Sequence, residues 1–172
     1  MKLKFKIAFT ITTILAIFSW IIAAYYWDKL PSVIPTHFGI SGLADGWSDK
    51  SIFQVFLLPF IQSLMLALFV FVYHRPQYSN IPSTMWLAML DSKHKEHAYD
   101  LIRTMHIGVF VLVGLMFTYI TYGMNYSALN NNLGLSTPVL LTIIGLMIIW
   151  LIYWTVKIYR ETKSAITSFN KN

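Results

Sequence analysis

Long apolar runs alternate with polar segments along this chain. Four runs reach the length needed to cross a bilayer, and none contains Asp, Glu, Lys or Arg: residues 7–27, 52–73, 105–122 and 138–156. In hydrocarbon every backbone amide must be paired internally, and the runs lack the alternation of barrel strands. The pattern therefore predicts an all-α integral membrane protein with four transmembrane helices.

The polar segments divide the chain into three parts. Residues 1–73 form two spans around a loop at 28–51, residues 74–104 form a connector, and residues 105–172 form a second helical hairpin with a basic tail. Only the first hairpin encloses a loop rich in proline and glycine, because the segment 125–137 is uncharged and plain. We therefore infer no internal duplication.

Composition and charge agree with a membrane protein and orient it. Hydrophobic residues make up 56% of the chain and charged residues 12%, against roughly 25% charged in soluble domains. Of the 13 Lys and Arg residues, only Lys29 and Lys50 fall in loops on the side opposite the termini. The positive-inside rule then places both termini in the cytoplasm and the loop 28–51 outside. The net charge of +6 follows from this asymmetry and predicts contact with the lipid bilayer, not with nucleic acid.

The N-terminal run has two interpretations. A lysine-rich start, an apolar run and Ala23-Ala24 also outline a cleaved signal peptide, but the run is long and ends in an aromatic belt, which favours a retained span. Small residues share one side of this helix, opposite three isoleucines, and would let a neighbouring helix approach closely: Ala8, Thr12, Ala16, Ser19 and Ala23 against Ile14, Ile17 and Ile21.

The loop 28–51 is rich in proline and glycine, which favour a defined backbone conformation. Pro31 and Pro35 favour an extended backbone before them, so the first helix should stop near Asp28. In the following extended segment, His37 should point away from Phe38. Asp45-Gly46 is a favourable turn pair, and Gly39 and Gly42 also permit positive φ, so we expect a compact hairpin or Ω-like loop.

The sequence "LPSVIPTHFGISGLADGWSDK" resembles the signature of an uncharacterised bacterial membrane-domain family. A Leu-Pro, an Ile-Pro-x-His-Phe, a glycine and an Asp-Gly-Trp precede a lysine and the next span in that family. The resemblance covers the first two spans, and the same domain forms the N-terminal part of proteins similar to the SdpI-type immunity proteins. It implies a location in the bacterial cytoplasmic membrane and a role in protection against a secreted peptide. SdpI-type proteins are usually longer than this chain, with more spans.

Candidate binding residues lie in the same loop. His37 titrates near neutral pH, and aspartates lie close to it in sequence. We predict two sets: ligand-binding residues His37, Phe38, Asp45, Trp47 and Lys50, and loop-shaping residues Pro31, Pro35, Gly42 and Gly46. One histidine with scattered aspartates makes a poor metal site, and no nucleophile stands in a recognisable setting. We therefore expect no metal, no cofactor and no catalytic residue.

The connector 74–104 is the second segment of interest. Met85, Trp86, Met89 and Leu90 would share one face of a short helix in the membrane surface. Asp91 or Ser92 would cap a new helix that continues into the third span. The connector either serves only as a link or binds a cytoplasmic regulator. His94 and His97 can share a helical face, but flanking charges favour a solvated surface over a metal site.

Two classes of function fit these features. In the first, the protein binds an extracytoplasmic peptide or envelope component through the loop 28–51 and provides immunity or sensing. In the second, it is an accessory subunit that acts through a membrane partner protein of a transporter or envelope complex. An enzyme is disfavoured because the spans lack clusters of carboxylates or histidines.

Overall fold

The computed structural model describes residues 2–79, 87–130 and 134–169. Among these residues there are four long helices, α1 (Leu3–Trp27), α2 (Ile52–His74), α4 (Ser92–Asn130) and α5 (Thr137–Phe169). Two strands, β1 (Val33–Phe38) and β2 (Ala44–Asp49), join α1 to α2, and a short 3-10 helix, η1 (Pro76–Tyr78), follows α2. All four long helices are long and apolar enough to cross a membrane, as predicted. The all-α prediction is incomplete, because it lacked the two strands.

The helices are longer than the predicted spans. α1 begins at Leu3 instead of residue 7, while α4 has 39 residues and α5 has 33. At 1.5 Å per residue, α4 is about 58 Å long, nearly twice the roughly 30 Å of hydrocarbon in a bilayer. Polar residues continue these helices in helical conformation outside the apolar runs, so residues 125–130 of the predicted loop 125–137 belong to α4.

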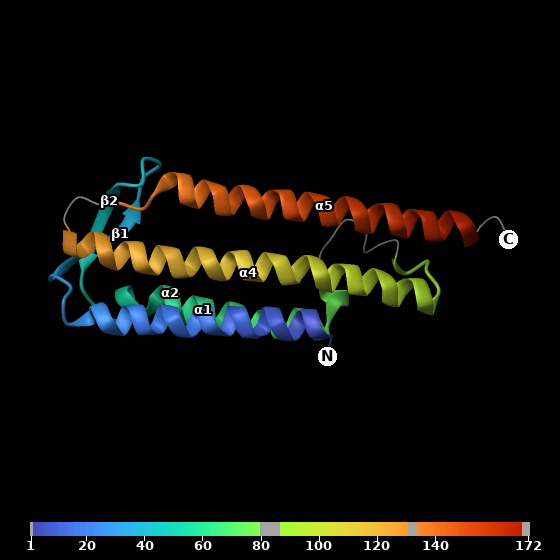
Figure 1. Cartoon of the computed structure of the whole chain (residues 1–172), viewed down its shortest axis with the longest axis horizontal. Helices are drawn as coiled ribbons and strands as arrows, with labels where there is room; N and C mark the ends of the chain where they lie inside the picture. The colour runs from blue at the N-terminus through green and yellow to red at the C-terminus, as the bar shows by residue number, and fades with distance from the viewer. Residues whose placement is uncertain (1, 80–86, 131–133, 170–172) are drawn as a thin grey trace.

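The four helices form a three-helix unit with α5 attached to one side (Figure 1). α1, α2 and α4 pack against one another, whereas α5 packs mainly against α4. α1 begins and α5 ends on the side away from the β-hairpin. We call the side with the strands the hairpin end and the opposite side the basic end.

The start of α4 is capped as predicted. Asp91 Oδ1 accepts a hydrogen bond of 2.9 Å from the backbone N–H of His94, and Asp91 Oδ2 lies 2.7 Å from its imidazole. The backbone amide of His94, and then its side chain, hold the pKa of Asp91 below its usual value. Of the predicted interfacial helix, Met85 and Trp86 lie outside the described residues. Leu90 is buried and Met89 is exposed.

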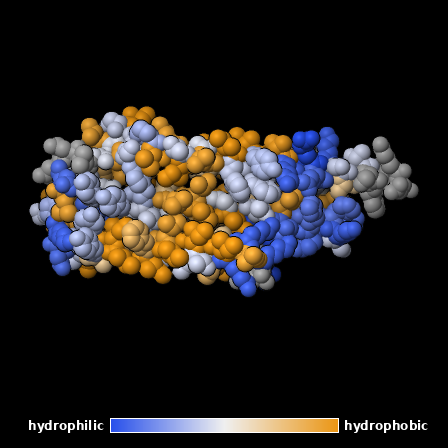
Figure 2. All heavy atoms as spheres, viewed as in Figure 1, coloured by the Kyte–Doolittle hydropathy of each residue, from blue (hydrophilic) through white to orange (hydrophobic). Residues whose placement is uncertain are grey.

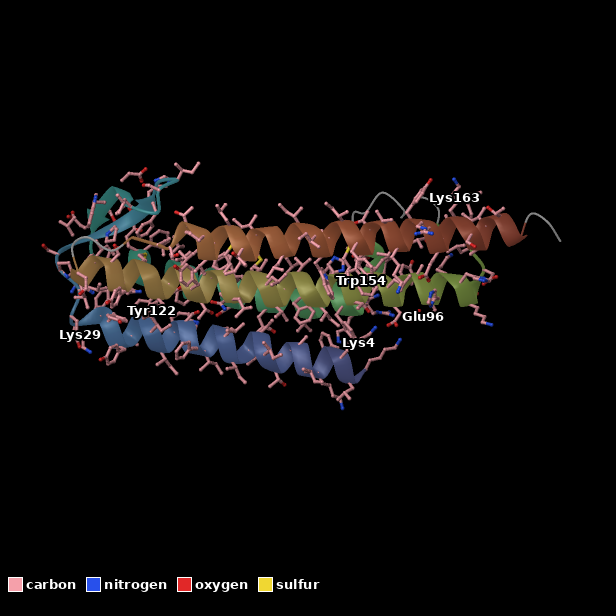
Figure 3. The ribbon with its side chains drawn as sticks, turned by 45° about the horizontal axis from the view of Figure 1, so that its top comes forward. Lys4, Lys29, Glu96, Tyr122, Trp154 and Lys163 are labelled. Atoms are coloured by element: carbon pink, nitrogen blue, oxygen red, sulfur yellow. The ribbon has the colours of Figure 1, made fainter. Side chains whose placement is uncertain are left out.

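The basic end is highly charged, in contrast to the apolar middle of the molecule (Figure 2). Lys4, Glu96 and Lys163 lie there, and Lys29 lies at the hairpin end (Figure 3). Asp100 bonds to the ammonium groups of Lys2 and Lys4, at 2.6 and 3.2 Å. Burial of Asp100 raises its pKa, but the two lysines outweigh that effect and leave the pKa lowered.

The small-residue side of α1 is buried inside this chain. Ala8, Thr12, Ala16, Ser19 and Ala23 are buried, while Ile14, Ile17 and Ile21 are more than half exposed. This confirms the prediction that the small side chains allow close approach of another helix. Because α2 and α4 occupy that side, it is not available to a partner protein.

A polar network at the centre of the three-helix unit joins α1, α2 and α4. Ser19 Oγ donates to Gln62 Oε1 at 2.6 Å, and Gln62 Nε2 donates to the Gly114 carbonyl and to Thr118 Oγ1, both at 3.1 Å. Gln62 is only 3% exposed. Ser19 Oγ also lies 3.0 Å from Thr118 Oγ1. The network therefore fixes the rotation of the three helices relative to one another.

We expect Gln62→Leu to destabilise the three-helix unit by about 2 kcal/mol, since three hydrogen bonds worth about 0.6 kcal/mol each in a membrane are lost. Unfolding in mixed micelles with increasing denaturing detergent measures this change. Gln54→Leu is the matched control, because Gln54 is in the first turn of the same helix and is partly exposed. Equal stability of the two variants would contradict a stabilising role for the network.

Candidate functional site

The candidate site is the β-hairpin between α1 and α2. The antiparallel strands pair Val33 with Asp49 and Pro35 with Trp47, and the register shifts on both sides of His37. The turn lies between Gly39 and Leu43, where Gly42 N donates to the Gly39 carbonyl at 2.8 Å and Gly39 N donates to the Leu43 carbonyl at 2.9 Å. The predicted compact hairpin is therefore present.

The predicted turn at Asp45-Gly46 is wrong. Both residues belong to β2, and Gly46 pairs with His37 across the strands. Gly42, with φ of 82°, is the positive-φ glycine among the described residues. Gly46 is needed for a different reason: a Cβ atom there would lie 2.8 Å from the Cβ of His37. Close cross-strand approach, not turn conformation, therefore favours glycine at position 46.

The predicted alternation of faces along β1 holds only in part. Ile34 and its neighbour Pro35 are both buried, and Thr36 and His37 are both exposed. The register shift between Pro35 and His37 breaks the two-residue period that the prediction assumed. His37 is exposed and Phe38 is half-buried, so the two side chains do differ in environment.

The base of the hairpin is fixed to the helices. α1 ends at Trp27, in agreement with the stop expected near Asp28 ahead of Pro31. Ile34 packs in a buried cluster with Leu30, which lies between α1 and β1, and with one residue each of α1, α2 and α4: Ala23, Val55 and Ala128. Lys50 Nζ donates to the carbonyls of Trp27 and Leu30 at 3.2 and 3.1 Å. Lys50 thereby binds the carbonyl end of α1, where a cation is favourable.

The tip of the hairpin is fixed to the segment before α5. Leu135 N donates to the Gly42 carbonyl at 2.8 Å, and Thr137 Oγ1 donates to the Ile40 carbonyl at 3.1 Å. The backbones approach so closely that a Cβ atom on Gly134 would lie 1.9 Å from the Gly42 oxygen. The plain, uncharged pattern of residues 125–137 did not predict this contact, for which Gly134 was a local signal.

Polar and aromatic side chains are exposed between these two attachments. His37 Nδ1 bonds to Asp45 Oδ1, and the two side chains are 73% and 53% exposed. Trp47 is half exposed on the neighbouring strand. The pair offers an imidazole and a carboxylate, both of which can form hydrogen bonds with a ligand. Within the described residues, no three His, Cys, Asp or Glu residues are grouped to hold a metal ion.

Of the five predicted ligand-binding residues, the structure thus brings His37 and Asp45 into contact, places Phe38 and Trp47 on the same two strands, and bonds Lys50 to the carbonyl end of α1. Pro35 is fully buried opposite Trp47, and Pro31 is exposed just after α1. Sequence reasoning missed Ile40 and Leu43, two exposed apolar residues at the tip. Their apolar character next to Gly42 was visible, but their exposure depends on where the turn forms.

Comparison with known proteins places this hairpin inside a recognised domain. Residues 14–62 match the family model described as "Domain of unknown function (DUF1648)". The match spans the second half of α1, both strands and the first half of α2. No curated protein and no solved structure matches the chain significantly. The chain therefore carries a domain of unknown function and has the features of a multi-pass membrane protein.

Proposed function

We propose that this membrane protein binds an extracytoplasmic peptide or envelope component at the hairpin end, in an immunity or sensing role. The observation that carries the proposal is the placement of exposed binding groups on a hairpin that is attached at its base and at its tip. A preformed surface loses little conformational entropy when it binds. The proposed contacts are His37, Phe38, Asp45 and Trp47, with Lys50 holding the surface in place through α1.

The proposal requires the hairpin end to face outward. The concentration of lysine and arginine at the basic end supports that orientation in a bacterial cytoplasmic membrane. The resemblance of the loop to the N-terminal domain of SdpI-type immunity proteins supports a peptide as the ligand. We propose binding without turnover, because the hydrogen bond described for the His37 side chain is to Asp45 and not to a Ser or Thr hydroxyl group that it could activate.

A second candidate function is that of an accessory subunit in a transporter or envelope complex. The small-residue side of α1, which first suggested it, is occupied by α2 and α4. The surface that favours this function is instead the outer side of α5, where Leu141, Ile149 and Ile152 are more than half exposed. A partner helix would have to compete with lipid for that surface. A cytoplasmic regulator could contact the long ends of α4 and α5 at the basic end.

The test of binding is the double variant His37→Ala with Trp47→Ala. Cells that lack the gene are compared with their parent for sensitivity to secreted peptides and envelope-active compounds, and the variant is then reintroduced. We expect the variant to accumulate in the membrane normally but to lose the protective or sensing effect, because it lacks the imidazole and the largest exposed ring of the hairpin.

The matched control is His74→Ala with Tyr78→Ala, which removes an exposed histidine and an exposed aromatic residue near the opposite end. This control should retain the effect. If the hairpin variant protects as well as the unmodified chain, the hairpin is not the binding site. Recovery of a cleaved or modified compound that depends on His37 would instead indicate an enzyme.

A further inference from the structure

The tip of the hairpin carries two apolar side chains in an unusual position. Ile40 is 97% exposed and Leu43 is 56% exposed, although the carbonyl of Ile40 and that of Gly42, beside Leu43, accept hydrogen bonds from Thr137 and Leu135. No charged residue occurs between Phe38 and Ala44. A turn in water usually has polar residues at its most exposed positions, whereas this tip has two large apolar side chains there.

The depth of the tip follows from its contacts with α5. Thr137 Oγ1 donates to the Ile40 carbonyl at 3.1 Å, and Thr137 is the first residue of α5. The apolar run 138–156 is about 28 Å long in helical form, close to the roughly 30 Å of bilayer hydrocarbon. The hydrocarbon boundary at the hairpin end therefore lies near Thr137, and Ile40 lies at the same level.

Several backbone groups of the tip are hydrogen-bonded within the protein, which suits an environment with little water. Within the turn, Gly39 N and Gly42 N donate to the carbonyls of Leu43 and Gly39. The carbonyls of Ile40 and Gly42 accept bonds from Thr137 and Leu135. Peptide groups that approach a bilayer must be paired in this way, because hydrocarbon offers no partner.

Exposed apolar residues also occur at the start of α5, directly after the residue that bonds to the tip. Val139 and Leu141, which follow Thr137 by two and four residues, are exposed by 41% and 62%. Both belong to the apolar run 138–156, which is predicted to face lipid. Because the Ile40 carbonyl is hydrogen-bonded to Thr137, lipid that covers the start of this run also reaches the hairpin tip. The occupant that fits this uncharged, apolar and shallow surface is the lipid bilayer itself.

We propose that the hairpin tip, residues 39–43, inserts Ile40 and Leu43 into the interfacial layer of the bilayer leaflet at the hairpin end. The tip then acts as a membrane anchor that fixes the height of the His37 and Asp45 pair above the lipid surface. This inference does not depend on the proposed ligand binding, because it concerns different side chains of the hairpin.

The test uses the absence of cysteine from the chain. A single Ser41→Cys variant is spin-labelled and reconstituted in phosphatidylcholine vesicles, and the accessibility of the label to oxygen and to a water-soluble nickel complex is measured. Labels at Lys93→Cys, on the exposed first turn of α4, and at Ile149→Cys, on the exposed side of α5, calibrate water and hydrocarbon. We expect the label at position 41 to prefer oxygen over nickel relative to the label at position 93.

Replacing Ile40 with a polar residue should change the accessibility of the label at position 41. In the Ile40→Gln background the label at position 41 should become more accessible to nickel, whereas Ile52→Gln, at an isoleucine of α2 that is 69% exposed, should leave it unchanged. A label as accessible to nickel as that at position 93, or one unaffected by Ile40→Gln, would overturn the proposal. Broadening from spin–spin contact at position 41 would overturn it as well, and would indicate that a second copy of the chain covers the tip.

Discussion

Replacing Gly42 with valine is expected to release the hairpin tip from the segment before α5. Gly42 has φ of 82°, a conformation that costs a non-glycine residue about 1–2 kcal/mol. A Cβ atom there would also lie 2.0 Å from the Leu135 carbonyl oxygen, so the backbones must separate and lose the two bonds between them. We expect a total cost of about 3–4 kcal/mol for the docked hairpin. Limited proteolysis should show rapid cleavage between β1 and β2.

Two controls separate the causes of that effect. Gly145→Val introduces the same side chain on α5, where a Cβ atom meets no atom within 4 Å, and should leave the hairpin protected. Gly134→Ala adds a Cβ atom that would lie 1.9 Å from the Gly42 oxygen, at a position without positive φ. If it also exposes the hairpin, close backbone approach is the main cause. An uncleaved hairpin in Gly42→Val would show that the tip is held by other contacts.

Replacing Gly108 with valine is expected to separate α5 from α4. A Cβ atom at Gly108 would lie 2.2 Å from Trp150 Cε2, and the Trp150 indole donates to the Met105 carbonyl at 2.9 Å. The indole must move and lose this bond. Overpacking of about 1–3 kcal/mol then weakens a helix that packs mainly against α4.

Crosslinking between the two helices measures this separation. Thr155 Oγ1 lies 3.9 Å from Met105 Sδ, so a short thiol-reactive crosslinker should join cysteines at positions 105 and 155 across the helices. The yield should fall strongly in Gly108→Val and remain high in Gly145→Val. Undiminished crosslinking in Gly108→Val would mean that Trp150 adjusts without displacing α5.

Local signals in the sequence were sufficient for the helices. Four apolar runs predicted the four long helices, because the requirement to pair backbone groups in hydrocarbon acts on each run separately. The cap at Asp91 and the small-residue side of α1 were also predicted, since both depend on residues within a few turns of one helix. The ends of α4 and α5 were not, because polar residues continue a helix without any hydropathy signal.

The contacts inside the helix bundle could not be predicted from the sequence and are known only from the structure. Gln54 and Gln62 are the amide side chains of the apolar run 52–73, and Gln62 lies near its middle, so it was visible as an exception. Its partners Ser19 and Thr118 are 43 and 56 residues away in sequence. Hydropathy cannot identify such partners, because it does not specify the rotation of one helix against another.

By itself the sequence determined that this protein has four membrane-length helices and a constrained loop with exposed polar chemistry. The tertiary structure decided where that loop turns and what holds it. Asp45-Gly46 has the stronger local turn preference, but the bond from Leu135 N to the Gly42 carbonyl and the burial of Ile34 and Pro35 accompany a turn at 39–43 instead. Local preferences of about 1 kcal/mol are outweighed when several distant contacts agree on another register, and no pattern within the loop records those contacts.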